Sequence, residues 1–158
     1  MPKKNSSPGA AGKKPLPPTY LFSAILGMAI LHFLFPVRTI LRFPLILTGL
    51  LPFALGAYLN MAADRLFKQA ETTVKPYEES SCLIRGGVFR ISRNPMYLGF
   101  ILILAGLALM AGTLSPWLVV PAFAVVMEFV FIRPEERMLE ETFGDAWLDY
   151  RAGVRKWI

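Results

Sequence analysis

Residues 95–132, PMYLGFILILAGLALMAGTLSPWLVVPAFAVVMEFVFI, decide the fold, because two apolar runs are separated there by only a short turn at Gly112–Ser115. Each run approaches the roughly 20 residues that carry an α-helix across a hydrocarbon core about 30 Å thick. A connection of a few residues forces the two helices into an antiparallel hairpin. The polar residues on either side of the hairpin are therefore predicted to meet at one of its ends.

Two further apolar segments precede the hairpin, so the sequence predicts an all-α integral membrane bundle of about four transmembrane helices. After the hairpin, Leu139, Phe143, Trp147 and Tyr150 recur every three or four positions with charges between them. This spacing indicates a C-terminal amphipathic helix, expected to lie on the membrane surface or to cap the bundle. The expected membrane domain covers residues 19–158, with spans at about 19–35, 44–63, 95–112 and 114–132, a loop at 64–94 and the interfacial helix at about 134–152. Residues 1–18 are rich in Pro, Gly, Ser and Lys and predict a disordered basic tail.

The composition excludes several classes of protein. Hydrophobic residues make up 54% and charged residues 18% of the 158 positions, and the mean hydropathy is +0.48, too apolar for an ordinary soluble domain. The single cysteine, Cys82, cannot form an internal disulfide. The single histidine, His32, has no Cys or His cluster around it at metal-binding spacing, so no metal site is expected.

The net charge of +6 would raise nucleic acid as a partner for a soluble protein. In a membrane protein it indicates orientation instead, because Lys and Arg collect in cytoplasmic segments beside anionic headgroups. Cations are concentrated in the tail, in the 64–94 loop and after residue 132, whereas the turn at Gly112–Ser115 has none; Arg38 and Arg42 weaken the contrast. We expect an inner or plasma membrane protein with both termini and the long loop in the cytoplasm, the bilayer as partner and no nucleic acid.

The stretch before the hairpin, LIRGGVFRISRNPMYLG at residues 83–99, has the residue types of an anion site. Gly86 and Gly87 give the backbone freedom, and Arg93 is one of three arginines in the stretch. Asn94 and Pro95 then mark a change from extended chain to helix, where the first N–H groups have no partner within the helix. The alternative interpretation is a cytoplasmic basic loop followed by a helix that begins at proline.

The stretch after the hairpin, EFVFIRPEERMLEETFGDAW at residues 128–147, supplies carboxylates at the same end. Glu128 falls about 6 Å inside the expected boundary of its span, where carboxylates are costly and usually functional. Glu135 and Glu136 follow at the mouth of the bundle. Together with Arg93 they predict either an ion-pair network or a site for a zwitterion, with carboxylates binding its ammonium group and arginine its carboxylate.

These motifs carry a family resemblance. The string GGVFRISRNPMYLG (86–99), followed by EERML (135–139), FG (143–144) and VRKWI (154–158), resembles the membrane methyltransferases that comprise isoprenylcysteine carboxyl methyltransferases and phospholipid N-methyltransferases. The resemblance implies S-adenosylmethionine at the cytoplasmic face and a lipophilic small-molecule or lipidated acceptor, either an isoprenylcysteine-type carboxylate or a phospholipid amine. The residues that it places around the cofactor are Arg93, Asn94, Pro95, Tyr97, Gly99, Glu135 and Glu136.

The candidate catalytic residues are Arg93, Glu128 and Glu136, with Glu128 or Glu136 as the base if the acceptor is an amine or a thiol. A carboxylate acceptor needs no base. Two other functions stay open at this point. Membrane sterol and enone reductases have a similar Asn-Pro and Tyr signature and use NADPH, and a non-catalytic membrane scaffold would use the Met and aromatic residues only for helix packing.

Overall fold

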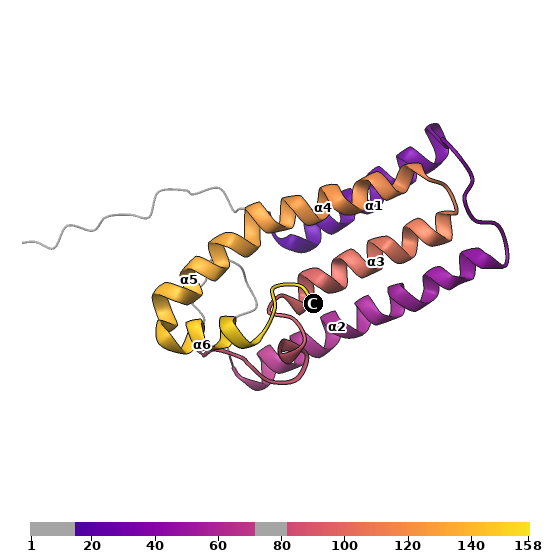
Figure 1. Ribbon diagram of the computed structural model, residues 1–158. Coiled ribbons are helices and arrows are strands. Elements are labelled where there is room, and N and C mark those ends of the chain that lie inside the picture. Colours follow the sequence, from indigo (N-terminus) through magenta and orange to yellow (C-terminus); the bar gives the residue numbers. More distant parts are fainter. Residues whose placement is uncertain (1–14, 72–81) are drawn as a thin grey trace, which may run out of the picture.

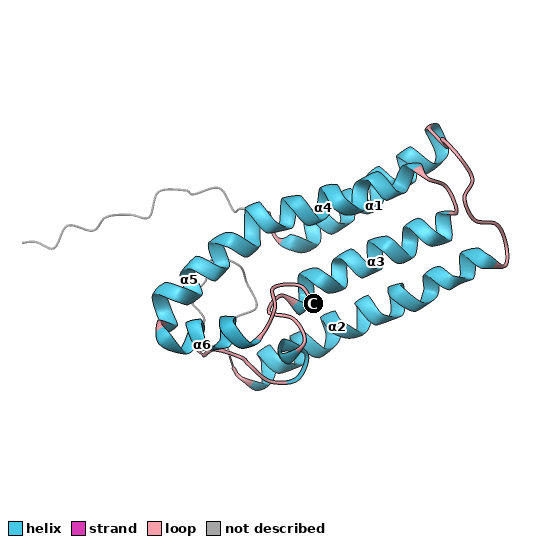
Figure 2. Cartoon of the chain, in the orientation of Figure 1, coloured by secondary structure: helices cyan, strands magenta, loops and turns pink. Residues whose placement is uncertain are grey.

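Four apolar helical segments run alongside one another in the computed structural model, which describes residues 15–71 and 82–158 (Figures 1 and 2). Within these residues there is no strand beyond one isolated bridge between Thr39 and Thr113, so the all-α class is confirmed. Most of the predicted tail (1–14) and the centre of the predicted loop (72–81) lie outside the described residues.

The first three apolar segments are helical, and the second continues to Gln69, six residues beyond the predicted end of its span. Their bounds are α1 Pro17–Leu34, the short helix η1 Leu45–Gly49 leading into α2 Leu50–Gln69, and α3 Pro95–Ala111. A further short helix, η2 Gly87–Arg90, precedes α3. Among residues 15–71 and 82–158, three helical segments are long and apolar enough to cross a membrane, namely Pro17–Leu34, Leu45–Gln69 and Ser115–Phe143. The fourth apolar helix, α3, has 17 residues, at the lower limit for a span.

The C-terminal part differs from the prediction of a span at 114–132 and a separate surface helix at 134–152. One helical segment continues through η3 Ser115–Leu118, α4 Val119–Met127, η4 Glu128–Ile132 and α5 Arg133–Phe143. Pro134 does not end it but lies in the first turn of α5, directly after the π-helical turn η4. The break comes instead at Gly144, whose φ of 49° is readily adopted by glycine, and α6 Asp145–Gly153 follows.

Helices α2 and α3 pack closely because glycines face each other at two levels. A Cβ atom on Gly56 would collide with the carbonyl oxygen of Gly99, and one on Gly106 with the carbonyl oxygen of Gly49. The glycines are seven residues apart on each helix, so both pairs fall on one face of an antiparallel crossing. Figure 1 shows the two helices side by side along their length, and this contact fixes where α3 begins relative to α2.

Helix α6 turns back to cover the end of the bundle at which α3 begins (Figure 1). Trp147 is 2% exposed and Tyr150 is also buried, both packed with Leu59 of α2 and with Phe89 of η2. The aromatic residues of the predicted amphipathic helix therefore cap the bundle rather than contact lipid.

Candidate functional site

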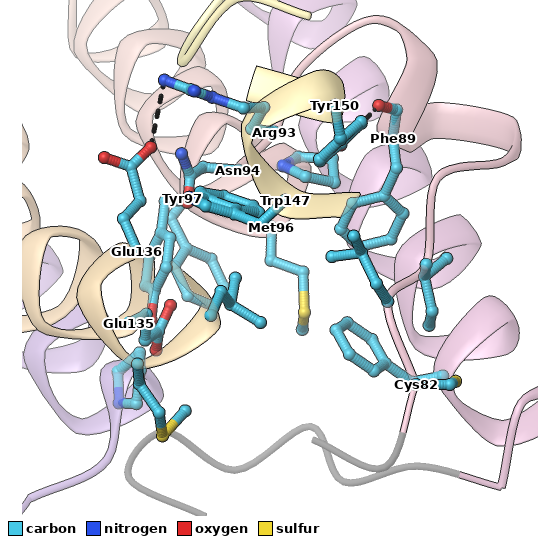
Figure 3. A pocket seen from close by; sticks show the side chains of 18 of the residues that line it. Cys82, Phe89, Arg93, Asn94, Met96, Tyr97, Glu135, Glu136, Trp147 and Tyr150 are labelled. Atoms are coloured by element: carbon cyan, nitrogen blue, oxygen red, sulfur yellow. Dashed lines mark hydrogen bonds and ion pairs between the residues drawn. The ribbon is translucent and has the colours of Figure 1, made fainter. Parts of the chain in front are cut away.

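A cavity of about 290 Å³ lies at the capped end of the bundle (Figure 3). The start of α1, the end of α2, the segment before α3, the first turns of α3, and helices α5 and α6 all contribute to it. Its polar edge consists of Arg93, Asn94, Glu135 and Glu136, and apolar side chains form most of the remainder. The apolar lining includes Leu16, Pro17, Pro18, Phe67, Leu83, Ile84, Phe89, Met96, Phe100, Met138, Leu139 and Trp147, with Cys82 among them.

Arg93 has hydrogen-bond donors that no group in the described part of the chain accepts. Its side chain is only 7% exposed, and its Nη2 atom lies 3.1 Å from Oε1 of Glu136. The guanidinium carbon lies 5.6 Å from the ring centre of Trp147. Nε and Nη1 of Arg93 and Nε1 of Trp147 are buried without a hydrogen-bond partner in the described part of the chain. Buried donors of this kind are costly unless a ligand accepts from them, so they indicate an anion-binding position.

The turn that carries Arg93 is held by the backbone of the C-terminal segment and by its own side chains. The N–H of Asn94 donates to Oγ of Ser92 at 3.1 Å, and Nδ2 of Asn94 donates to the carbonyl of Lys156 at 3.2 Å. Pro95 then opens α3 at a helix start, where the first N–H groups of the helix have no partner within it. The start of α3 thus faces the polar edge of the cavity.

The two neighbouring acids of α5 are in different environments. Tyr97 donates its hydroxyl hydrogen to Oε1 of Glu135 at 2.6 Å, and no cation among residues 15–71 and 82–158 pairs with Glu135. Glu136 instead forms ion pairs with Arg93 and, through Oε2 at 2.9 Å, with Lys156. Glu135 is therefore the carboxylate at the cavity whose negative charge is not matched by a cation of the described chain.

The structure brings together six of the residues predicted for the site and leaves two outside the cavity. Arg93, Asn94, Pro95, Tyr97, Glu135 and Glu136 all line it. Glu128 does not; it pairs with Arg133 at 3.2 Å and with Lys156 at 2.9 Å. Gly99 does not either, because it lies against Gly56 and Asn60 of α2, where a larger residue would collide with both.

Several lining residues were missed by the sequence reasoning. Trp147 and Tyr150 were identified as apolar positions of a helix expected on the membrane surface or capping the bundle, but not as cavity residues, because only the break at Gly144 turns them inward. Tyr150 donates to the carbonyl of Phe89 at 2.7 Å, and burial raises its pKa to about 12 although the charge of Arg93 lowers it. No pattern marked Cys82 or the start of α1 as parts of the cavity, since both reach it only through the tertiary fold.

Fold and site together define a helical membrane protein with a mixed polar and apolar cavity at one end of its bundle. The model of the phospholipid methyltransferase family matches residues 44–146. An uncharacterized protein from Haemophilus influenzae is 40% identical over 63 residues, which are 40% of this chain and the whole of that protein. The chain therefore belongs to the phospholipid methyltransferase family, and the predicted resemblance is confirmed at the level of the family.

A solved structure shares the fold. It is that of the eukaryotic intramembrane Ras methyltransferase, isoprenylcysteine carboxyl methyltransferase, with a TM-score of 0.65 and 24% identity. The similarity covers 89% of this chain and 51% of that enzyme, so the chain spans about half its length. At this identity the likeness bears on the fold.

Proposed function

We propose that this protein transfers a methyl group from S-adenosylmethionine to a lipophilic acceptor at one face of the membrane. The single observation that carries the proposal is that the described residues leave two donors of buried Arg93 unpaired, beside a carboxylate in the same cavity with which none of their cations pairs. S-adenosylmethionine has one carboxylate and two cationic groups, so this arrangement of charges fits it. Family membership favours methyl transfer over the reductase and the scaffold.

The residues divide into two sets by the charge that they would bind. Nε or Nη1 of Arg93, whose guanidinium lies over Trp147, would donate to the carboxylate of the cofactor. Glu135, oriented by Tyr97, would attract the ammonium or sulfonium group. Gly99 and Glu128, which lie outside the cavity, have no place in this assignment.

When bound, S-adenosylmethionine supplies a methyl carbon that forms a bond to the acceptor atom while its bond to sulfur breaks, leaving S-adenosylhomocysteine. The protein's tasks are to align the two reactants and to exclude water. The apolar lining around Phe67, Phe89 and Leu139 excludes water and suits an acceptor that arrives from the bilayer. A carboxylate acceptor needs no base. An amine must lose a proton, and Glu135 is the carboxylate available, because Glu136 is held by two cations.

We further propose that the cavity opens toward the cytoplasm. The described chain begins and ends at this end of the bundle, since Leu16 lines the cavity and the carbonyl of Lys156 accepts from Asn94. Cations are more numerous at this end than at the other, where Arg38 and Arg42 lie in the connection between α1 and α2.

The test is calorimetric binding of S-adenosylmethionine and, separately, NADPH to the full chain purified in detergent. Wild-type protein is expected to bind S-adenosylmethionine saturably, and Arg93→Met to weaken it by about ten-fold or more, since a charged hydrogen-bonding group is lost. Arg151→Met is the matched control, because Arg151 pairs only with exposed Glu140 in the described structure. Folded wild-type protein that binds no S-adenosylmethionine would overturn the proposal. If the wild-type protein does bind S-adenosylmethionine, transfer of a labelled methyl group to a prenylcysteine acid or to an aminophospholipid identifies the acceptor.

A further inference from the structure

The C-terminal segment folds back onto the turn that carries the cavity's arginine. The N–H of Arg93 donates to the carbonyl of Arg155 at 3.0 Å. Ser92 Oγ and Asn94 Nδ2 donate to the carbonyl of the next residue, Lys156, at 3.1 and 3.2 Å. Three consecutive residues of the turn are thus attached to two consecutive residues near the end of the chain.

The side chain of Lys156 continues this attachment into the charged edge of the cavity. Its Nζ atom lies 2.9 Å from Oε1 of Glu128 and 2.9 Å from Oε2 of Glu136. The other oxygen of Glu136 lies 3.1 Å from Nη2 of Arg93. A line of alternating charges therefore runs from Glu128 through Lys156 and Glu136 to Arg93, while Lys156 itself is absent from the cavity lining.

The burial of these groups makes them depend on one another. From Lys156 to Arg93 the side-chain exposure falls from 28% for Lys156 to 15% for Glu136 and 7% for Arg93, and that of Glu128 is 18%. Burial alone lowers the pKa of Lys156, but its hydrogen bonds and charge contacts with Glu128 and Glu136 outweigh that effect and raise the pKa overall, so the side chain stays cationic. Removing one member of a partly buried charge network leaves its partners uncompensated, and they rearrange.

We propose that Lys156 is a positioning residue that acts through Glu136 to orient the guanidinium of Arg93, so that one of the donors left unpaired by the described chain, Nε or Nη1, stays directed to the ligand's carboxylate. This inference rests on the proposed function, because it concerns the same anion position. Glu128 then has a role different from the predicted one: it anchors Lys156 from outside the cavity.

The test compares two ligands that differ only in the group that Arg93 would hold. Affinities of the full chain for S-adenosylmethionine and for its decarboxylated form are measured in Lys156→Met, Lys156→Arg and Arg151→Met. Lys156→Met is expected to weaken S-adenosylmethionine by about ten-fold and the decarboxylated form by less than about three-fold. Lys156→Arg, which retains the cation, restores the affinity for S-adenosylmethionine. The control Arg151→Met leaves both affinities unchanged.

The outcomes separate this inference from the proposed function. If Lys156→Met loses affinity equally for both ligands, Lys156 is merely structural. If it loses affinity for neither, the orientation of Arg93 does not depend on Lys156. Either result overturns the inference, whereas binding of S-adenosylmethionine by the wild-type protein still upholds the proposed function. Wild-type protein that binds neither ligand overturns both. If Lys156→Met does not fold, as judged by its helical circular dichroism, Lys156→Gln carries the same comparison, since it removes the charge but keeps a hydrogen-bond donor.

Discussion

The hydroxyl of Tyr97 on α3 lies 2.6 Å from Oε1 of Glu135 on α5, and this hydrogen bond joins the two sides of the hairpin at the cavity. The adjacent Glu136 is held by Arg93 and Lys156 instead. Neighbouring carboxylates thus have distinct tasks: one is oriented by a neutral donor and leaves its charge for a ligand, and the other fixes the protein's own cations.

This division predicts how Glu135→Gln affects binding. The substitution keeps the size of the side chain but removes the negative charge, so affinity for S-adenosylmethionine should fall by about ten-fold. Tyr97→Phe leaves the charge in place and removes only its orienting donor, so its effect should be smaller. Calorimetry with both variants checks the order. Equal affinities of wild type and Glu135→Gln would contradict the assignment of Glu135 to a cationic group.

The sequence was sufficient to predict that the two motifs meet, because a hairpin with a short turn leaves little freedom. Arg93, Tyr97 and Glu136 reach one cavity for that reason. It was not sufficient to separate the roles of Glu135 and Glu136, since these depend on Lys156, which reaches Glu136 only when the C-terminal segment folds back. Glu128 was predicted as a candidate catalytic residue inside its span, but it lies outside the cavity lining, where the distant Lys156 and the nearby Arg133 pair with it.

Helix packing was also only partly predicted. The spans followed from hydropathy, but Gly99 was assigned to the cofactor because it belongs to the motif that begins α3, and the structure places it against α2. Gly99 and Gly106 are seven residues apart, and so are Gly49 and Gly56. This equal spacing of small residues in two apolar segments is a signal of helix contact that is present in the sequence.

Close packing at these glycines predicts that Gly56→Ala destabilises the bundle. The added methyl group would collide with the backbone of Gly99 and Ile103, which cannot move independently of α3. Overpacking of this kind costs about 1–3 kcal/mol, so the unfolding temperature in detergent should fall. Gly27→Ala is the matched control in α1, because no heavy atom of the described chain outside the adjoining helix backbone lies within 4 Å of the position of its Cβ. A Gly56→Ala protein as stable as Gly27→Ala would show that α2 and α3 are less closely packed.

The buried hydroxyl of Tyr150 predicts a loss of stability in alkali. Its folded pKa of about 12 lies above the value near 10 of an unfolded chain, so its stabilisation is complete below pH 10 and is lost as the pH rises toward 12. Unfolding temperatures between pH 8 and 11.5 should therefore decline above pH 10, and less steeply in Tyr150→Phe. The control is Tyr58→Phe, because Tyr58 is exposed on α2. An ultraviolet titration in which Tyr150 ionises near pH 10 would refute the explanation.

The single cysteine offers a direct measure of whether ligands occupy the cavity. Cys82 is partly buried and lines the apolar side, where the acceptor is proposed to bind, so a ligand bound there is expected to hinder the approach of a maleimide to its thiol. S-adenosylmethionine or a lipophilic acceptor at ten times its dissociation constant should slow the labelling about ten-fold, because only unoccupied protein reacts. Moving the thiol to the opposite end of the bundle, as Cys82→Ser with Arg42→Cys, gives a control whose labelling should not respond. If the ligand slows labelling of both thiols, it changes the conformation of the whole bundle. If it slows labelling of Cys82 alone, the bound molecule lies in the cavity, which has Arg93 and Glu135 at its polar edge.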